Sequence, residues 1–160
     1  MDDGLRLDQI LVPIDGSENA RDAAQQAVRL ARTCASTVTF LHVVSDAVVA
    51  ELAQREIDDG ERRAHDRLVE QGRAYLRDVA RLAEHCAVPH REVVGDGDPC
   101  AVICETAAGI GADLVVMGKI GHQGARRILV GSIARRVIET CDRPVLIVPI
   151  APPAAETGPR

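Results

Sequence analysis

Short runs of apolar residues alternate along this chain with stretches in which apolar side chains recur every three or four positions. Uninterrupted apolar runs are typical of parallel strands, because helices cover both faces of such a sheet. The recurring positions are typical of helices that pack one face against a sheet. Five runs predict strands, at residues 9–14, 37–44, 91–94, 114–117 and 145–148.

Four helices are predicted between these strands. The first carries a stripe of small residues from Ala20 to Ala31, and the second keeps helical spacing from Leu68 to Cys86. Residues 45–60 have a mixed pattern that fits a loop carrying a helical turn.

Capping residues mark the starts of the other two helices. Asp98 and Pro99 predict an N-cap and the first helical residue, because Asp accepts hydrogen bonds from free amides and Pro has no amide to leave unpaired. Ser132 is predicted to be the N-cap of the last helix, whose apolar face would run from Ile133 to Cys141.

This order predicts an α/β fold, a single-domain, doubly wound, five-stranded parallel sheet with helices on both faces. Each crossover is long enough for a right-handed connection between parallel strands. Ligands of such sheets bind at the carboxyl ends of the strands, where the strand order reverses. If the reversal lies between the first and fourth strands, Asp15 and Gly118 face each other across that crevice.

Composition narrows the possible partners and compartment. The 160 residues allow one domain, which we place at 9–150, with disordered ends at 1–8 and 151–160. A net charge of -5 and an aromatic content of 1% argue against nucleic acid, which needs positive charge or stacking platforms. Five cysteines, an odd number, favour a reducing cytoplasm. No apolar run approaches the about 20 residues of a membrane span.

The stretch with the clearest chemistry follows the fourth strand. Gly118 and Gly121 lie at its carboxyl end, and Gly131 and Ser132 open the last helix after a nine-residue spacer. Glycine permits positive φ and a close approach of the backbone to a ligand, and a helix start offers free N–H donors. We therefore interpret the stretch as a phosphate site. The alternative is that the glycines serve turns only and Ser132 is only a cap.

The spacing G-x2-G-x9-G-[S/T] resembles the nucleotide-binding signature of the universal stress protein family. The resemblance covers about residues 8–150, including ILVPIDGSENA, FLHVV, ADLVVMG and RPVLIVP. It implies an ATP-binding member that takes ATP with Mg2+, pairs as a homodimer through its last strand and acts as a nucleotide-dependent regulatory module in a stress response. It also implies a site in which Asp15, Val43 and Met117 lie near adenine and ribose. The phosphates would be held by Gly118, Gly121, Gly131 and Ser132, with Ile133 next on the helix.

Two positions depart from the pattern or leave alternatives open. Many ATP-binding members have Ser-His or Ser-Arg between the first two glycines, whereas this chain has Lys119 and Ile120. Lys119 supplies a phosphate charge or lies in solvent, and Ile120 offers no polar contact. Asp15 either contacts the ribose, base or Mg2+, or caps the first helix, a role that Ser17 fills equally well.

Other candidate groups have simpler interpretations. Arg126 and Arg127 either fold over the phosphates or form a solvated pair. Cys100 and Cys104 are interpreted as small apolar thiols rather than metal ligands, because no further ligands accompany them. His42 is interpreted as a structural, hydrogen-bonded residue.

No catalytic motif is present, neither GxxxxGK[ST], GxSxG nor HExxH. We therefore expect a binding protein rather than an enzyme. The alternatives are a slow ATPase or nucleotidyl-transfer enzyme, and a dimeric interaction module whose glycine loop stays empty.

Overall fold

The computed structural model describes residues 6–55, 59–120 and 130–150. Its strands are β1 (Gln9–Pro13), β2 (Thr37–Ser45), β3 (His90–Gly97), β4 (Leu114–Gly118) and β5 (Val145–Val148). Its helices are α1 (Glu18–Cys34), α2 (Asp46–Ala53), α3 (Gly60–His85), α4 (Pro99–Gly109) and α5 (Ser132–Thr140). The predicted α/β fold is confirmed: all five strands pair in parallel, in the order β3-β2-β1-β4-β5.

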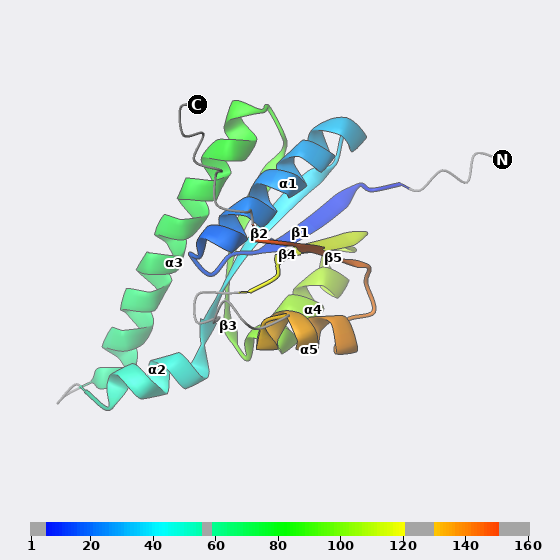
Figure 1. The fold of residues 1–160 in the computed structure, drawn as a ribbon. Helices are drawn as coiled ribbons and strands as arrows, with labels where there is room; N and C mark the ends of the chain where they lie inside the picture. Colours follow the sequence, from blue (N-terminus) through cyan, green and yellow to red (C-terminus); the bar gives the residue numbers. More distant parts are fainter. Residues whose placement is uncertain (1–5, 56–58, 121–129, 151–160) are drawn as a thin grey trace, which may run out of the picture.

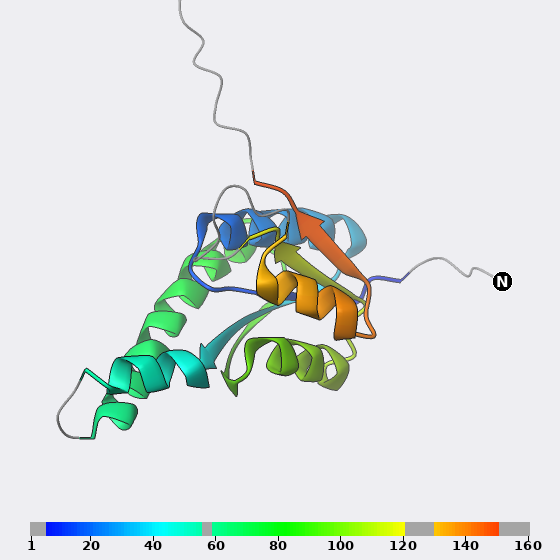
Figure 2. The same cartoon turned by 60° about the horizontal axis from the view of Figure 1, so that its bottom comes forward.

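Helices cover both faces of the sheet, with α1 and α3 on one face and α4 and α5 on the other (Figures 1 and 2). Because side chains alternate along a strand, β1 contributes side chains to the hydrophobic core on both faces of the sheet. Ile10 and Val12 pack in the core beneath α1 and α3, and Leu11 packs in the core beneath α4 and α5. The small side chains of α1, such as Ala24 and Ala27, are fully buried and let that helix lie close to the sheet.

Several elements differ in extent from the sequence prediction. The predicted third strand at 91–94 is too short, because β3 continues to Gly97 through pairing with the end of β2. The second predicted helix begins earlier, at Gly60, and residues 46–53 form a separate helix, α2. Leu7 and Asp8, expected in the polar N-terminal stretch, already hydrogen-bond to Ser36 and Asp113.

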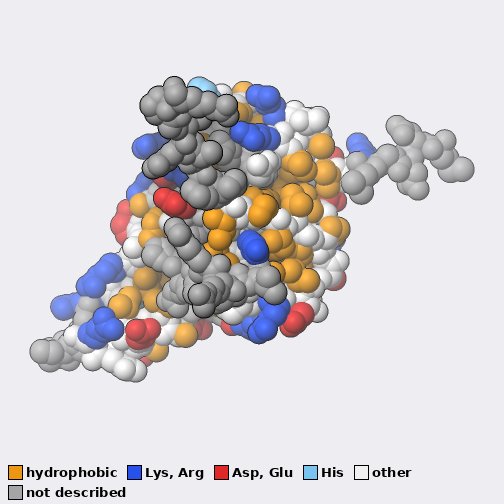
Figure 3. All heavy atoms as spheres, viewed as in Figure 1, with side chains coloured by type: hydrophobic (Ala, Val, Ile, Leu, Met, Phe, Trp, Pro, Cys, Tyr) orange, Lys and Arg blue, Asp and Glu red, His pale blue; other side chains and the backbone are white. Residues whose placement is uncertain are grey.

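The edge strand β5 is short and carries exposed apolar side chains. Figure 3 shows hydrophobic side chains gathered over β5 on that face of the molecule. Leu146 and Ile150 are exposed there, as are Ile133 and Ile138 on α5. The expected apolar face of α5 is therefore only partly buried, through Ala134 and Val137. No helix within the described ranges is long and apolar enough to cross a membrane.

Candidate functional site at the strand order reversal

The strand order reverses between β1 and β4, as the crevice prediction required. β1 pairs with β2, the next strand along the chain, on one side and with β4 on the other. Chain segments leaving β1 and β4 therefore diverge at their carboxyl ends, which opens a crevice in doubly wound sheets. Asp15 follows β1 there and Gly118 ends β4.

Hydrogen bonding and register bring the residues expected near adenine and ribose to this edge. The Ile14 N–H donates to the Leu41 carbonyl (2.7 Å), which aligns the end of β1 with β2 just before Val43. Val43 is half-buried, and Met117, at the end of β4, is buried. Asp15, Val43 and Met117 thus lie on three adjacent strand ends. Their contacts with a nucleotide remain a prediction.

The turn after β1 assigns the cap of α1 to Ser17. Its hydroxyl accepts a hydrogen bond from the Ala20 N–H (3.1 Å), while one carboxylate oxygen of Asp15 accepts from the Ser17 N–H (3.0 Å). Gly16 has a φ of 84°, and a Cβ there would lie 2.4 Å from the Tyr75 ring. The turn therefore requires glycine for both conformation and space, and Asp15 steadies it rather than capping the helix.

The structure gives a reason for glycine at position 118 that the sequence did not show. Its φ lies outside the left-handed region, so the expected positive φ is absent. A Cβ on Gly118 would instead lie 2.9 Å from the backbone oxygen and from side-chain atoms of Asn19. The missing side chain thus makes room for the start of α1.

Asn19 joins three segments around the base of the glycine stretch. It is buried, and its side-chain oxygen accepts a hydrogen bond from the Ile120 N–H (2.9 Å). Its amide nitrogen donates to the carbonyls of Val148 (3.3 Å) and Pro149 (3.5 Å). Sequence reasoning missed this residue. The available signal was a single amide side chain at the start of a stripe of small residues.

The first two amides after β4, those of Lys119 and Ile120, are already used within the protein. The Lys119 N–H donates to the Val148 carbonyl (2.9 Å), and the Gly131 N–H donates to the Lys119 carbonyl (2.7 Å). Together with the Ile120 bond to Asn19, these contacts close the base of the glycine stretch. Of the backbone donors expected after β4, those of Lys119 and Ile120 are therefore not free for a ligand.

Amides outside any helical ladder lie at the amino end of α5. The first hydrogen bond of this helix joins the Arg135 N–H to the Gly131 carbonyl (2.9 Å), so the amides of Ser132, Ile133 and Ala134 precede its ladder. The prediction that Ser132 is the N-cap is wrong. Gly131 is the N-cap, with extended backbone, and no side chain caps the helix. The first turn of α5 also carries no acidic residue. No side chain of the cap or the first turn of α5 therefore neutralises the positive end of the helix dipole.

Gly121, Arg126 and Arg127 lie outside the described residues. Of the remaining predicted site residues, Lys119, Gly131 and Ser132 are brought together by the Gly131–Lys119 hydrogen bond. Ile133 follows on the first turn of α5, with 39% of its surface exposed. The structure thus gathers the described part of the expected phosphate site at one helix end.

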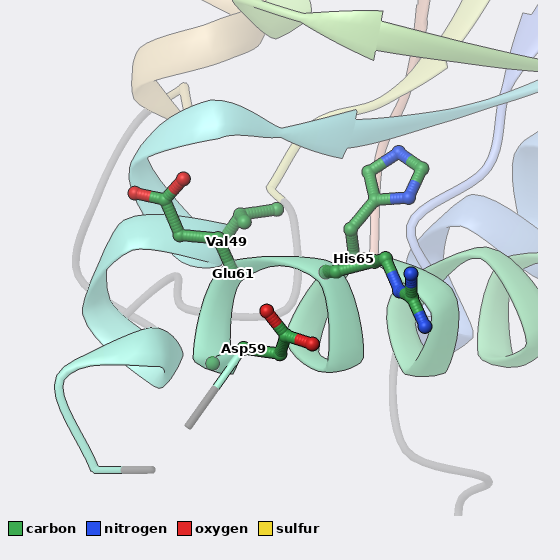
Figure 4. A pocket seen from close by; sticks show the side chains of 6 residues that line it. Val49, Asp59, Glu61 and His65 are labelled. Carbon is green, nitrogen blue, oxygen red and sulfur yellow. The ribbon is translucent and has the colours of Figure 1, made fainter. Parts of the chain in front are cut away.

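A hollow of about 630 Å3 lies between α2 and the start of α3, away from the strand order reversal. Asp59, Glu61 and His65 line it, and in Figure 4 their side chains point in different directions rather than toward a common centre. A hydrogen bond to Asp96 (2.6 Å) raises the pKa of His65. The arrangement offers no convergent set of ligands.

His42 is the structural, hydrogen-bonded residue that the sequence suggested, and the two thiols of α4 lie beside Thr140. Cys100 is buried and Cys104 is half-buried, and both sulfurs lie near the Thr140 hydroxyl, at 3.3 and 3.7 Å. No group of three His, Cys, Asp or Glu side chains could hold a metal ion within the described residues. His42 is buried and bonds through Nδ1 to the Ile14 carbonyl (2.7 Å).

Comparison with known proteins identifies the family. The universal stress protein family model matches residues 7–149. This chain belongs to the universal stress protein family. The universal stress protein MJ0531 of Methanocaldococcus jannaschii is 34% identical over 140 residues, which cover 88% of this chain and 81% of the relative.

Solved structures of universal stress proteins share the fold. The structure of MJ0577, from the same organism, has a TM-score of 0.81 at 24% identity and covers 92% of this chain and 99% of its own. A universal stress protein crystallised in complex with cAMP has a TM-score of 0.67 at 20% identity, with coverage of 91% and 99%. Residues 7–149 therefore carry the universal stress protein fold.

Proposed function

We propose that this universal stress protein binds ATP at the crevice between β1 and β4, with the phosphates at the amino end of α5. The observation that carries the proposal is the uncapped start of α5 beside the end of β4, at the strand order reversal. The amides of Ser132, Ile133 and Ala134 can donate to phosphate oxygens, and the helix dipole favours an anion there. The adenosine would lie toward Asp15, Val43 and Met117.

A nucleotide complex of a protein with the same fold supports nucleotide binding as the function. The universal stress protein crystallised with cAMP has this architecture and accommodates an adenine nucleotide. Mg2+ takes one or two carboxylates besides phosphate oxygens and water, so Asp15 suffices as its protein ligand. Lys119, half-buried beside Gly131, is placed to add a positive charge near the phosphates.

We propose that the function is to bind ATP and that ATP hydrolysis is not part of it. ATP would stabilise one arrangement of the segment after Lys119, and a partner would recognise that arrangement. A product assay distinguishes this from a slow ATPase: ADP release that depends on Asp15 or Lys119 would favour the enzyme.

Replacing Ser132 by proline tests the phosphate site directly. Ser132 is the first helical residue, where proline is well tolerated and removes the amide hydrogen together with the hydroxyl. The preceding Gly131 has φ −62° and ψ 155°, a conformation compatible with a following proline. A hydrogen bond to a charged group contributes about 1.5–3 kcal/mol, so we expect ATP affinity to fall roughly ten- to hundredfold.

Ser132→Ala is the matched control, because it keeps the amide and removes only the hydroxyl. Calorimetry with ATP should show a much larger loss for Ser132→Pro than for Ser132→Ala, at unchanged melting temperature. Equal affinities of the two variants would refute the placement of the phosphates. Absence of heat with the unmodified protein would favour an interaction module with an empty loop.

We also propose that two copies pair through β5. This strand is at the edge of the sheet, where β4 is its one neighbouring strand in the described sheet, and an unpaired apolar edge tends to find a partner. Leu146 and Ile150 are exposed beside it, with Ile138 on the neighbouring α5. Pairing would remove these side chains from water.

A further inference from the structure

A hollow of about 540 Å3 lies between α1 and α3, on the face of the sheet opposite α4 and α5. We call it the arginine groove. Its lining combines a basic rim and an apolar floor: Arg21, Gln25, Val28, Arg29, Arg32, Asp78, Arg81, Leu82, His85 and Cys86. None of these residues belongs to the proposed nucleotide site.

The rim of the groove carries unbalanced positive charge. Arg21 is paired with Asp78 (2.5 Å), which is the acidic residue of the lining. Within the described ranges, Arg29, Arg32 and Arg81 have no ion-pair partner. This excess of arginine stands out in a chain whose net charge is -5. At the top of Figure 3, Lys and Arg side chains and a histidine lie together over the carboxyl end of α3.

The shape of the groove suits an extended chain. Lining residues recur at helical spacing from Arg21 to Arg32 on α1 and from Asp78 to Cys86 on α3. At about 1.5 Å per residue, the α1 side extends over roughly 16 Å. About five residues of extended peptide span that length. The arginines are therefore distributed along a line rather than collected around one point.

The floor of the groove is apolar. Val28 is buried there, and Leu82 and Cys86 are half-buried. Apolar side chains of a bound chain would lose water against this floor, while the arginine stems cover further apolar surface and keep their charges at the rim.

We propose that the arginine groove binds a short acidic segment of a partner protein, with its carboxylates on Arg29, Arg32 and Arg81 and its apolar side chains on the floor. Arginine pairs with carboxylates through two parallel hydrogen bonds, which gives the contact direction as well as charge. A single phosphate would need donors that converge on it, and these are spread along the rim. Single-stranded nucleic acid would need aromatic platforms, and the lining contains none.

A labelled peptide of alternating glutamate and leucine tests the proposal in fluorescence anisotropy at low salt, without nucleotide. The glutamate–leucine peptide should bind more tightly than a glutamate–serine peptide, because only leucine uses the floor. A lysine–leucine peptide should not bind. Binding should weaken with added salt, as charge pairing requires.

Charge reversal locates the site. Arg29→Glu with Arg81→Glu should weaken peptide binding at least about tenfold, since each exposed pair contributes up to about 1 kcal/mol and reversal adds repulsion. Arg63→Glu with Arg73→Glu is the control, because both residues are exposed on α3 outside the lining and the change in net charge is identical.

Three results would overturn the proposal: no binding of the glutamate–leucine peptide, equal weakening in the control variant, or no preference for leucine over serine. Anionic vesicles or RNA that bind more tightly than the peptide, with the same dependence on Arg29 and Arg81, would overturn it as well. The outcome does not depend on ATP binding, so the proposed nucleotide function stands or falls separately.

Discussion

Gly72, in the middle of α3, is the position at which a single added methyl group has the clearest consequence. Gly72 is buried against β2, and a Cβ on it would lie 2.1 Å from Cδ2 of His42 and 2.7 Å from Nε2. The His42 ring cannot simply turn away, because Nδ1 donates to the Ile14 carbonyl (2.7 Å) and the ring packs edge-on against Tyr75. Gly72→Ala must therefore displace a buried, hydrogen-bonded side chain.

Two opposing effects decide the sign of the change in stability. Alanine in a helix interior is favoured over glycine by about 1 kcal/mol. Against this, the ring must move by more than about 1 Å to restore a normal contact of about 3.5 Å. Overpacking costs about 1–3 kcal/mol, and losing the hydrogen bond of His42 costs about 1 kcal/mol more. We expect Gly72→Ala to lower the free energy of unfolding by about 1–3 kcal/mol.

Thermal and urea unfolding, followed by circular dichroism, measure this difference. For a chain of this size about 2–4 °C of melting temperature correspond to each kcal/mol, so the melting temperature should fall by roughly 2–12 °C. Gly109→Ala is the matched control, because Gly109 ends α4 and, apart from its own helix backbone and chain neighbours, no atom of the described residues lies within 4 Å of its added methyl group. That variant should be neutral or slightly stabilised.

A second substitution separates the contact from other causes. Adding His42→Ala to Gly72→Ala should cost less than the sum of the two single changes, because the clash disappears with the ring. If Gly72→Ala were as stable as Gly109→Ala, or if the two changes were additive, the close approach of α3 to β2 would be refuted.

Three further predictions concern other parts of the molecule. Asn19→Leu should lower the free energy of unfolding by about 2–3 kcal/mol, because it leaves the Ile120 N–H without its buried acceptor; faster hydrogen exchange at that amide would show it. Burial raises the pKa of the Cys104 thiol to about 11, so its alkylation should be slow at neutral pH and become faster toward pH 11. Peptide mass mapping should show Cys104 alkylated more slowly than the exposed Cys34 at every pH. Leu146→Glu should convert the proposed dimer to monomer in light scattering, whereas Gln26→Glu, exposed on α1, should not; an unchanged mass would count against pairing through β5.

Much of the fold was predictable because it depends on local patterns. The apolar runs at 37–44, 114–117 and 145–148 matched β2, β4 and β5 closely, since a strand buried on both faces needs little context to be recognised. The start of α4 was predicted to the residue, because the Asp98 side chain accepts from the Ala101 N–H as its cap. Capping is local chemistry, and the sequence contains it whole.

The candidate site was predictable only in outline. Its glycine spacing located the right stretch, but the sequence could not say which amides stay free. Pairing across the chain decides that, because the Lys119 and Gly131 N–H groups bond to Val148 and Lys119, respectively. Among the described residues, the amides outside the helical ladder at the start of α5 are then the candidate donors. Asn19 could not be recognised either, because its three partners are 101 to 130 residues away.

By itself, the sequence determined the elements, the parallel sheet and the position of the glycine stretch, because hydrophobic period, capping and turn chemistry act over a few neighbouring residues. Tertiary structure alone decided the strand order, the extension of β3 to Gly97 along β2, and the use of each missing Cβ. Gly118 makes room for Asn19 and Gly72 for His42. Those contacts join residues far apart in the chain, and only the packed fold brings them within van der Waals distance.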